Sequence, residues 1–134
     1  MSVTPQNIDV VRQVVTGRRT IGGKKTVSKD ASLPGVSVSV AANTTDTEVI
    51  CPIDVSQIGV ICLSSDQDVT VDVNSTETPT PSIALKANAP YIWDADSYFV
   101  NLLTVDVVKF YVSNGGTAAA TFEIEGNYDS TPAS

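Results

Sequence analysis

From residue 36 onward, apolar and polar residues alternate with a period of two, which constrains the fold more than any other feature. VSVSVA (36–41) sets valines against serines, and DVTVDV (68–73) sets valines against Asp and Thr. FEIE (122–125) continues the pattern. Alternation of this kind is typical of strands with one face on a core and the other in solvent. The residues predicted to face inward are Val36, Val38, Val40, Val69, Val71, Val73, Phe122 and Ile124.

Short apolar runs between these segments complete a series of about eight or nine strands, spaced as in all-β proteins. These runs cover residues 47–53, 58–63, 83–85, 91–94, 97–103 and 107–114. Pro52 indicates an edge strand or a strand end, and NGGT (114–117) predicts a hairpin turn. No long amphipathic helix follows residue 16, so a parallel α/β sheet is excluded. We expect an all-β protein with an antiparallel β-sandwich or jelly-roll-like body over 34–129 and a polar tail over 130–134.

Residues 1–33 have a different composition and predict an extended basic N-terminal arm. TGRRTIGGKKT (16–26) has three glycines and no large apolar cluster, so it offers little surface to bury. Residues 6–15 fit a helix or a strand equally well. Six cations and one acid, Asp9, give residues 1–29 a charge of +5. Residues 30–134 carry a charge of −12, and the two together give the net charge of −7. The cations are Arg12, Arg18, Arg19, Lys24, Lys25 and Lys29.

Three interpretations of this arm are open: a solvated tail, a nucleic-acid contact, or a contact with an acidic protein surface. The acidic body and the lack of interleaved aromatic residues argue against nucleic acid. We favour the third, because glycines let a chain follow a foreign contour and arginines pair bidentately with carboxylates. The six cations are therefore the candidate partner-binding residues.

The sequence holds few of the nucleophilic and metal-binding side chains, histidine and cysteine, that catalytic sites often use. Histidine is absent, which removes histidine-based triads and the commonest metal ligand. Cys51 and Cys62 are interpreted as reduced thiols, and no cofactor or metal is expected. The acid pairs are interpreted as a solvated surface in preference to a calcium site or a glycosidase, so we expect no enzyme. These pairs are Asp66 with Asp68, Asp94 with Asp96, and Glu123 with Glu125.

PYIWDADSYF (90–99) gathers four aromatic residues, Tyr91, Trp93, Tyr98 and Phe99. Large aromatic side chains anchor cores and interfaces, so Tyr91, Trp93 and Phe99 are assigned to the core or to a trimer interface. An exposed platform for a sugar is the alternative. No apolar run approaches the roughly 20 residues of a membrane span, and the N-terminus shows no secretory signal pattern.

Three segments resemble small phage virion proteins of the head decoration, or capsid cement, type. They are TEVICPIDVSQIG (47–59), VNSTETPTPSIALKANAPYIWDADSYF (73–99) and DVVKFYVSNGGTAAATFEIEGNYDSTP (106–132). The resemblance covers about half of the chain and does not include the basic arm. It implies a non-enzymatic virion protein, made in the host cytoplasm, on the outer capsid surface. It further implies a homotrimer that clamps neighbouring major capsid protein subunits and stabilises the shell. The alternative function is a carbohydrate-binding adhesion module on a virion or tail.

Overall fold

The computed structural model describes residues 6–97 and 99–130, and these form eleven strands with one short 3-10 turn, η1 (Val55–Gln57). Tyr98 and residues 131–134 of the predicted tail lie outside the described residues. The strands are β1 (Gln6–Val15), β2 (Thr20–Lys29), β3 (Ala31–Ser32), β4 (Val36–Val40), β5 (Thr44–Ile53), β6 (Ile58–Ser65), β7 (Val69–Val73), β8 (Ser82–Leu85), β9 (Tyr91–Asp94), β10 (Val107–Asn114) and β11 (Ala120–Tyr128).

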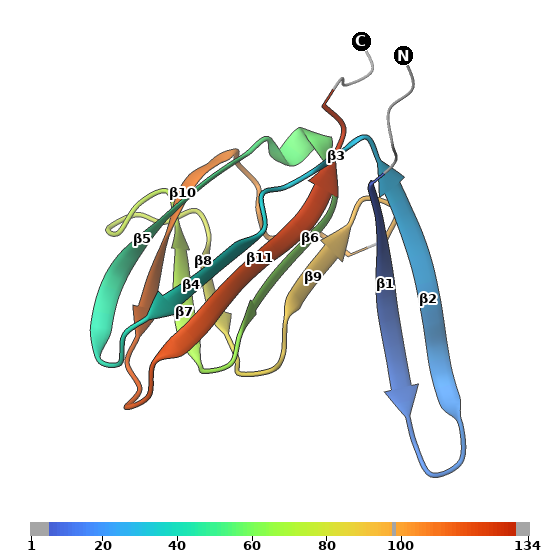
Figure 1. The fold of residues 1–134 in the computed structure, drawn as a ribbon, viewed down its shortest axis with the longest axis horizontal. Helices are drawn as coiled ribbons and strands as arrows, with labels where there is room; N and C mark the ends of the chain where they lie inside the picture. Colours follow the sequence, from blue (N-terminus) through green and yellow to red (C-terminus); the bar gives the residue numbers. More distant parts are fainter. Residues whose placement is uncertain (1–5, 98, 131–134) are drawn as a thin grey trace.

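Two antiparallel sheets face each other and confirm the predicted all-β sandwich (Figure 1). One sheet has the strand order β5-β10-β7-β8. In the other, β11 and β6 are central, β9 forms one edge, and β3 and β4 both pair with β11 along the opposite edge. β5 is an edge strand with Pro52 near its end, as the sequence predicted.

The core between the sheets is built from the alternation seen in the sequence. Val69, Val71 and Val73 are buried, and so are Phe122 and Ile124, while the residues between them face outward. Phe110 of β10 meets Phe122 of β11 edge to face, with ring centroids 6.2 Å apart. This contact joins the two sheets at their centre.

Two local predictions were wrong. NGGT does not close a hairpin, because β10 and β11 belong to different sheets and the segment crosses between them. Asn114 is fully buried there, and its amide nitrogen donates to the carbonyls of Val40 and Ala118 at 3.2 and 2.8 Å. The described residues of 97–103 contain no strand and form an irregular loop between β9 and β10.

The N-terminal segment forms a β-hairpin, so the residues that fitted helix and strand equally are a strand. β1 pairs with β2 over ten residue pairs, from Gln6 opposite Lys29 to Val15 opposite Thr20. Gly22 has a φ of +106°, and a Cβ at that position would lie 2.0 Å from the carbonyl oxygen of Arg12. The close approach of β1 to β2 therefore requires glycine at this position.

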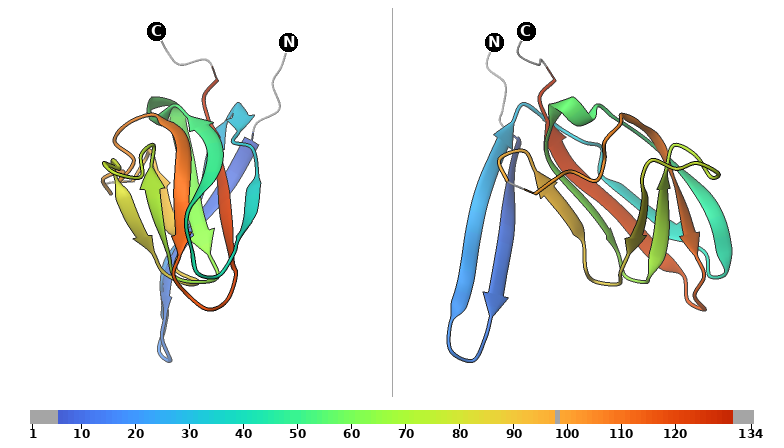
Figure 2. Two further views of the ribbon diagram at one scale, coloured as in Figure 1. Left: turned by 90° about the vertical axis from the view of Figure 1, so that its left-hand side faces the viewer. Right: turned by 180° about the vertical axis from the view of Figure 1, so that it is seen from behind.

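The hairpin stands beside β9, and its turn extends past the end of the sandwich (Figures 1 and 2). A single residue, Asp30, separates β2 from β3, which pairs with β11 of the body. The arm was predicted as an extended basic segment over residues 1–33. The actual segment is extended, but it is a paired ribbon with one end packed against the body. Among the described residues, no helix has the length and apolar character needed to cross a membrane.

Candidate functional site: the basic hairpin and its seat

One cross-strand row on the outer face of the β11-β6-β9 sheet holds the hairpin. Asn127 of β11 lies opposite Val60 of β6, and Val60 lies opposite Asp94 of β9. The three side chains are therefore neighbours on one face, although 67 positions separate the first two in sequence. An amide, an apolar side chain and a carboxylate thus form one seat for the hairpin.

The apolar part of the seat is a small cluster apart from the main core. Val10 of β1, Val27 of β2 and Val60 are each at most 4% exposed, and Ile8 and Ile92 pack around them. Ile8 lies opposite Val27 in the hairpin register, and Val10 is two residues further along β1, so all three share one face. This face, which we call the inner face, packs onto the body at the end of the hairpin near its termini, the base.

Asn127 joins the backbones of three strands at the base. Its side-chain nitrogen donates to the carbonyls of Gln6 and Val27 at 2.9 and 3.0 Å, and its side-chain oxygen accepts from the Val60 N–H at 3.0 Å. The side chain is fully buried and all three bonds are made inside the protein. Because a buried amide without partners is costly, these bonds fix the position of the hairpin on the sheet.

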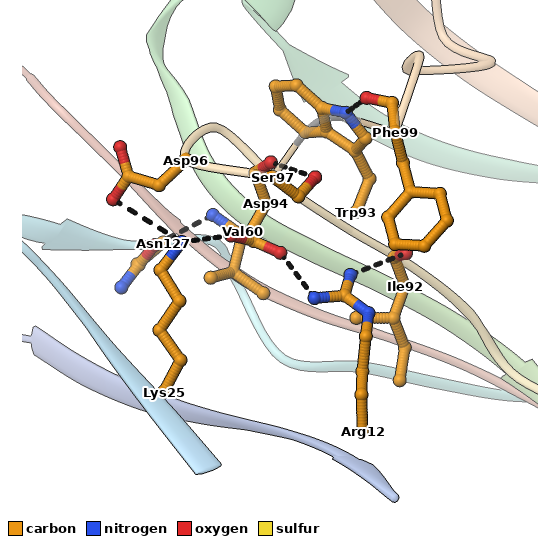
Figure 3. A network of polar contacts seen from close by, with 10 residues as sticks. All are labelled: Arg12, Lys25, Val60, Ile92, Trp93, Asp94, Asp96, Ser97, Phe99 and Asn127. Atoms are coloured by element: carbon orange, nitrogen blue, oxygen red, sulfur yellow. Dashed lines mark hydrogen bonds and ion pairs between the residues drawn. The ribbon is translucent and has the colours of Figure 1, made fainter. Parts of the chain in front are cut away.

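Asp94 is the electrostatic centre of the seat (Figure 3). Its side chain is 0% exposed, and its two oxygens accept from the Arg12 guanidinium at 2.7 Å and the Lys25 ammonium at 2.8 Å. Arg12 also donates to the Ile92 carbonyl at 3.3 Å. Burial by itself would raise the pKa of Asp94, but hydrogen bonds and charge from Lys25 and Arg12 outweigh it and leave that pKa below its ordinary value.

Further contacts tie down the end of the hairpin where the chain enters the body. Lys29 pairs with Asp129 at 3.3 Å. The connecting residue Asp30 accepts from the backbone N–H and the hydroxyl of Ser130 at 2.7 and 2.9 Å. Those hydrogen bonds lower the pKa of the Asp30 carboxyl. The hairpin is thus fixed at its base by apolar, neutral polar and charged contacts together.

The other half of the hairpin, residues 11–24 around the turn, we call the free half. Val14 lies opposite Ile21 on the inner face, but these side chains are 61% and 52% exposed because they lie beyond the edge of the body. Thr16 closes the turn: its N–H donates to the Arg19 carbonyl at 2.9 Å, and its hydroxyl oxygen accepts from the Arg18 and Arg19 N–H groups.

The structure divides the six predicted partner-binding cations into two groups. Arg12, Lys25 and Lys29 bind acids of the protein's own body. Lys24 lies 3.8 Å from Asp9 within the hairpin, and both side chains are largely exposed. Arg18 and Arg19 form no ion pair with any described residue. Within the free half, Arg18, Arg19 and Lys24 are therefore exposed, whereas Arg12 reaches back to Asp94.

The sequence did not identify two residues of the seat, Asp94 and Asn127. Asp94 was assigned to a solvated acidic surface, which is wrong, because it is fully buried beneath the hairpin. Asn127 was not singled out at all. The charge difference between residues 1–29 and the remainder was the one signal that pointed to an acid receiving the hairpin cations, and it did not identify which acid.

The predicted aromatic cluster lies next to this seat. Tyr91 and Trp93 are partly buried against the main core, and the Trp93 indole N–H donates to the Phe99 carbonyl at 2.8 Å. The Phe99 ring is 51% exposed and lies 5.2 Å beneath the Arg12 guanidinium, a cation–π distance. Phe99 is therefore not a core residue. Trp93 is partly buried and its indole N–H is already hydrogen-bonded to Phe99. This arrangement does not favour an exposed, flat aromatic surface for binding a sugar.

Three further acids and thiols singled out in the sequence, Asp68, Cys51 and Cys62, have shifted pKa values. The Ala87 N–H and Lys86 lower the pKa of Asp68, which is the opposite of what a general acid needs. Cys51 is a buried free thiol in the core, and Cys62 is a half-buried free thiol on the outer sheet face. Burial raises the pKa of both thiols, and Glu125 and Glu123 raise that of Cys62 further. Over the described ranges, no three acid or thiol side chains gather in a group that could hold a metal ion.

Comparison with protein families, with curated proteins and with solved structures finds no match to this chain. The sandwich and the anchored hairpin are thus the features from which a function has to be argued.

Proposed function

We propose that this protein is a structural virion protein that decorates a phage capsid, binds neighbouring major capsid protein subunits and stabilises the shell as a homotrimer. The observation that carries the proposal is the free half of the hairpin. It is anchored at its base, extends past the sandwich (Figure 2), and carries exposed arginines and valines, among them Arg18, Arg19, Val14 and Val15. A geometry of this kind suits a contact with another protein subunit.

Electrostatics favours a protein partner with an acidic surface. Residues 30–134 carry a charge of −12 and are repelled by nucleic-acid backbones and anionic membranes. Arg18 and Arg19, whose guanidinium groups form no ion pair with a described residue, can pair bidentately with carboxylates of a neighbouring subunit. The resemblance of residues 47–59, 73–99 and 106–132 to head decoration proteins supports the capsid as that partner.

Decoration needs no active site. A protein that binds only the assembled shell stabilises it by mass action, and docking through several copies multiplies a modest affinity. The lowered pKa values of Asp94 and Asp68 agree with structural rather than acid–base roles for these carboxylates. We accordingly propose that the protein is not an enzyme.

The test is co-sedimentation of the purified protein with emptied phage heads. Deletion of residues 1–29 would also expose Val60 and leave Asp94 unpaired, so a surface change is cleaner. We expect Arg18→Glu with Arg19→Glu to weaken binding at least about tenfold, because close opposite charges become like charges. The affinity of the unmodified protein should also fall with added salt.

Lys86→Glu is the matched control, because Lys86 is an exposed cation on the β8 side of the sandwich with one weak contact to Asp68 at 3.6 Å. It should leave co-sedimentation unchanged. Equal binding by the arginine variant and the unmodified protein would remove the hairpin from the proposed function. If the unmodified protein does not bind phage heads, the capsid is not its partner and the proposed function is wrong.

A further inference from the structure

The exposed apolar side chains of this protein are concentrated in two segments. Ten large hydrophobic residues are exposed among the described residues, and eight of them lie in the free half of the hairpin or in residues 99–105. The other two, Ile50 and Val108, lie on the outer face of the β5-β10 pair. The eight are Val11, Val14, Val15 and Ile21 in the hairpin and Phe99, Val100, Leu102 and Val105 in the loop.

The part of the free half beyond Arg12 repeats the chemistry of the seated part but has no seat beneath it. In the seated part, the apolar inner face of Val10 and Val27 is followed by Arg12 and Lys25, which bind a buried carboxylate. Further out on the same face, Val14 lies opposite Ile21, with Arg18 and Arg19 at the turn. The established interface between hairpin and body thus continues into a second apolar and cationic surface, and this surface is unoccupied in the single chain.

Residues 99–105 have the complementary character. Val100 is 84% exposed and Leu102 is 48% exposed. No Lys or Arg occurs between Lys86 and Lys109, whereas Asp96 and Asp106 flank the segment. The loop combines an apolar surface with two exposed carboxylates, Asp96 and Asp106, of which Asp96 also lies 3.8 Å from Lys25 of the same chain. The hairpin combines an apolar face with positive charge.

The loop is held in place, so its apolar side chains are presented in a fixed arrangement. The Tyr91 hydroxyl donates to Asn101 and accepts from the Leu102 N–H, and Leu103 is only 2% exposed in the core. At the far end, Asn74 donates to the Asp106 carbonyl at 2.8 Å. A preorganised apolar surface loses little conformational entropy on binding and is suited to an interface.

We propose that the free half of the hairpin in one copy binds residues 99–105 of a second copy of this chain. Charge complementarity and the continuation of the inner face select a second copy as the occupant. Val14 and Ile21 would pack on Val100 and Leu102, and Arg18 and Arg19 would approach Asp96 and Asp106. The inference rests on the homo-oligomer of the proposed function and names its contact, but it does not depend on the capsid.

Sedimentation equilibrium of the full chain tests the proposal without phage heads. The unmodified protein should associate reversibly. Ile21→Glu on the hairpin and Val100→Glu on the loop should each raise the dissociation constant at least about tenfold, because each buries a carboxylate in an apolar contact. Ile50→Glu is the matched control: Ile50 is 68% exposed on a different face, and its variant should associate normally.

Mixing the two disabled variants gives the sharpest outcome. The Ile21→Glu variant keeps an intact loop, and the Val100→Glu variant keeps an intact hairpin, so a mixture regains one good contact and should form a mixed pair. Isotope labelling of one variant identifies that pair by native mass spectrometry. Circular dichroism checks that each variant is folded, and so does the fluorescence of Trp93, the single tryptophan. If Ile21→Glu unfolds the hairpin, Ile21→Ser is used in its place.

Three results would overturn the proposal. The first is an unmodified protein that stays monomeric up to its solubility limit. The second is normal association of the Val100→Glu variant with loss in the Ile21→Glu variant, which would mean that hairpins pair with each other. The third is equal weakening by Ile50→Glu. If association fails while head binding persists, this inference falls and the capsid proposal stands.

Discussion

The sandwich and the β1–β2 hairpin are both antiparallel ribbons, but different interactions hold them in place. Twenty buried residues form the core of the sandwich, whereas the apolar cluster between hairpin and body has three buried members, Val10, Val27 and Val60. The hairpin relies instead on Asn127 and Asp94, whose bonds are few, specific and buried. A region stabilised by a few specific contacts can detach locally, while a region stabilised by a broad core unfolds as a whole.

The largest expected effect comes from breaking the sandwich. Phe122→Ala removes a fully buried ring that meets Phe110 across the two sheets, and we expect a loss of about 3–5 kcal/mol in the free energy of unfolding. Urea denaturation followed by circular dichroism measures it. Val10→Ala is the comparison within the hairpin and should move the urea midpoint far less. Equal shifts would show that hairpin and sandwich unfold as one unit.

A smaller effect should follow from removing the acid of the seat. Asp94→Ala breaks charge-assisted bonds to Arg12 and Lys25, and we expect the free energy of hairpin opening to fall by about 2 kcal/mol. Hydrogen exchange should show lost protection in β1 and β2, with protection in β6 and β10 retained.

Asp96→Ala is the matched control for Asp94→Ala. Asp96 is two residues away, 73% exposed, and 3.8 Å from the same Lys25 ammonium. An exposed ion pair of this kind contributes at most about 1 kcal/mol, so hairpin protection should change little. If the two variants behave alike, Asp94 does not anchor the hairpin.

The smallest expected effect is a pH dependence confined to the hairpin. Because the folded pKa of Asp94 lies below its ordinary 3.8, the stabilisation it provides is complete above about pH 3.8 and is lost as pH falls through the folded pKa. The Trp93 indole donates to the Phe99 carbonyl, and the Phe99 ring contacts Arg12, so Trp93 fluorescence should report hairpin release before the sandwich unfolds. Asp94→Asn should abolish that early transition, while Asp68→Asn should leave it intact. An unchanged transition in Asp94→Asn would assign it to another group.

Much of the sandwich could be predicted from the sequence, because side-chain alternation is a local property of an extended chain. The inward faces of β4, β7 and β11, and the edge position of Pro52, follow from neighbouring residues alone. Turn chemistry was less informative. NGGT has the composition of a hairpin turn, yet burial of Asn114 between the sheets turns it into a crossover.

The candidate site was predictable only in outline. The charge difference along the chain indicated that the basic segment would meet acids, and Arg12, Lys25 and Lys29 do so within the same molecule. It could not indicate Asp94, because that residue becomes a ligand for two cations only when β9 lies beside β6 and the hairpin covers both. Asn127 likewise gains its three hydrogen bonds only when β11 lies beside β6 and the hairpin covers both strands.

The sequence by itself determined that this chain forms strands, which residues of most strands face a core, and that its positive charge gathers near one end. Those are consequences of nearest-neighbour geometry and composition. Only the tertiary structure decided which strands share a sheet, that the basic segment is a paired ribbon, and that half of it is seated while half is free. These outcomes depend on which distant side chains become neighbours, and Asn127, Val60 and Asp94 meet in one row only after the sheet has formed.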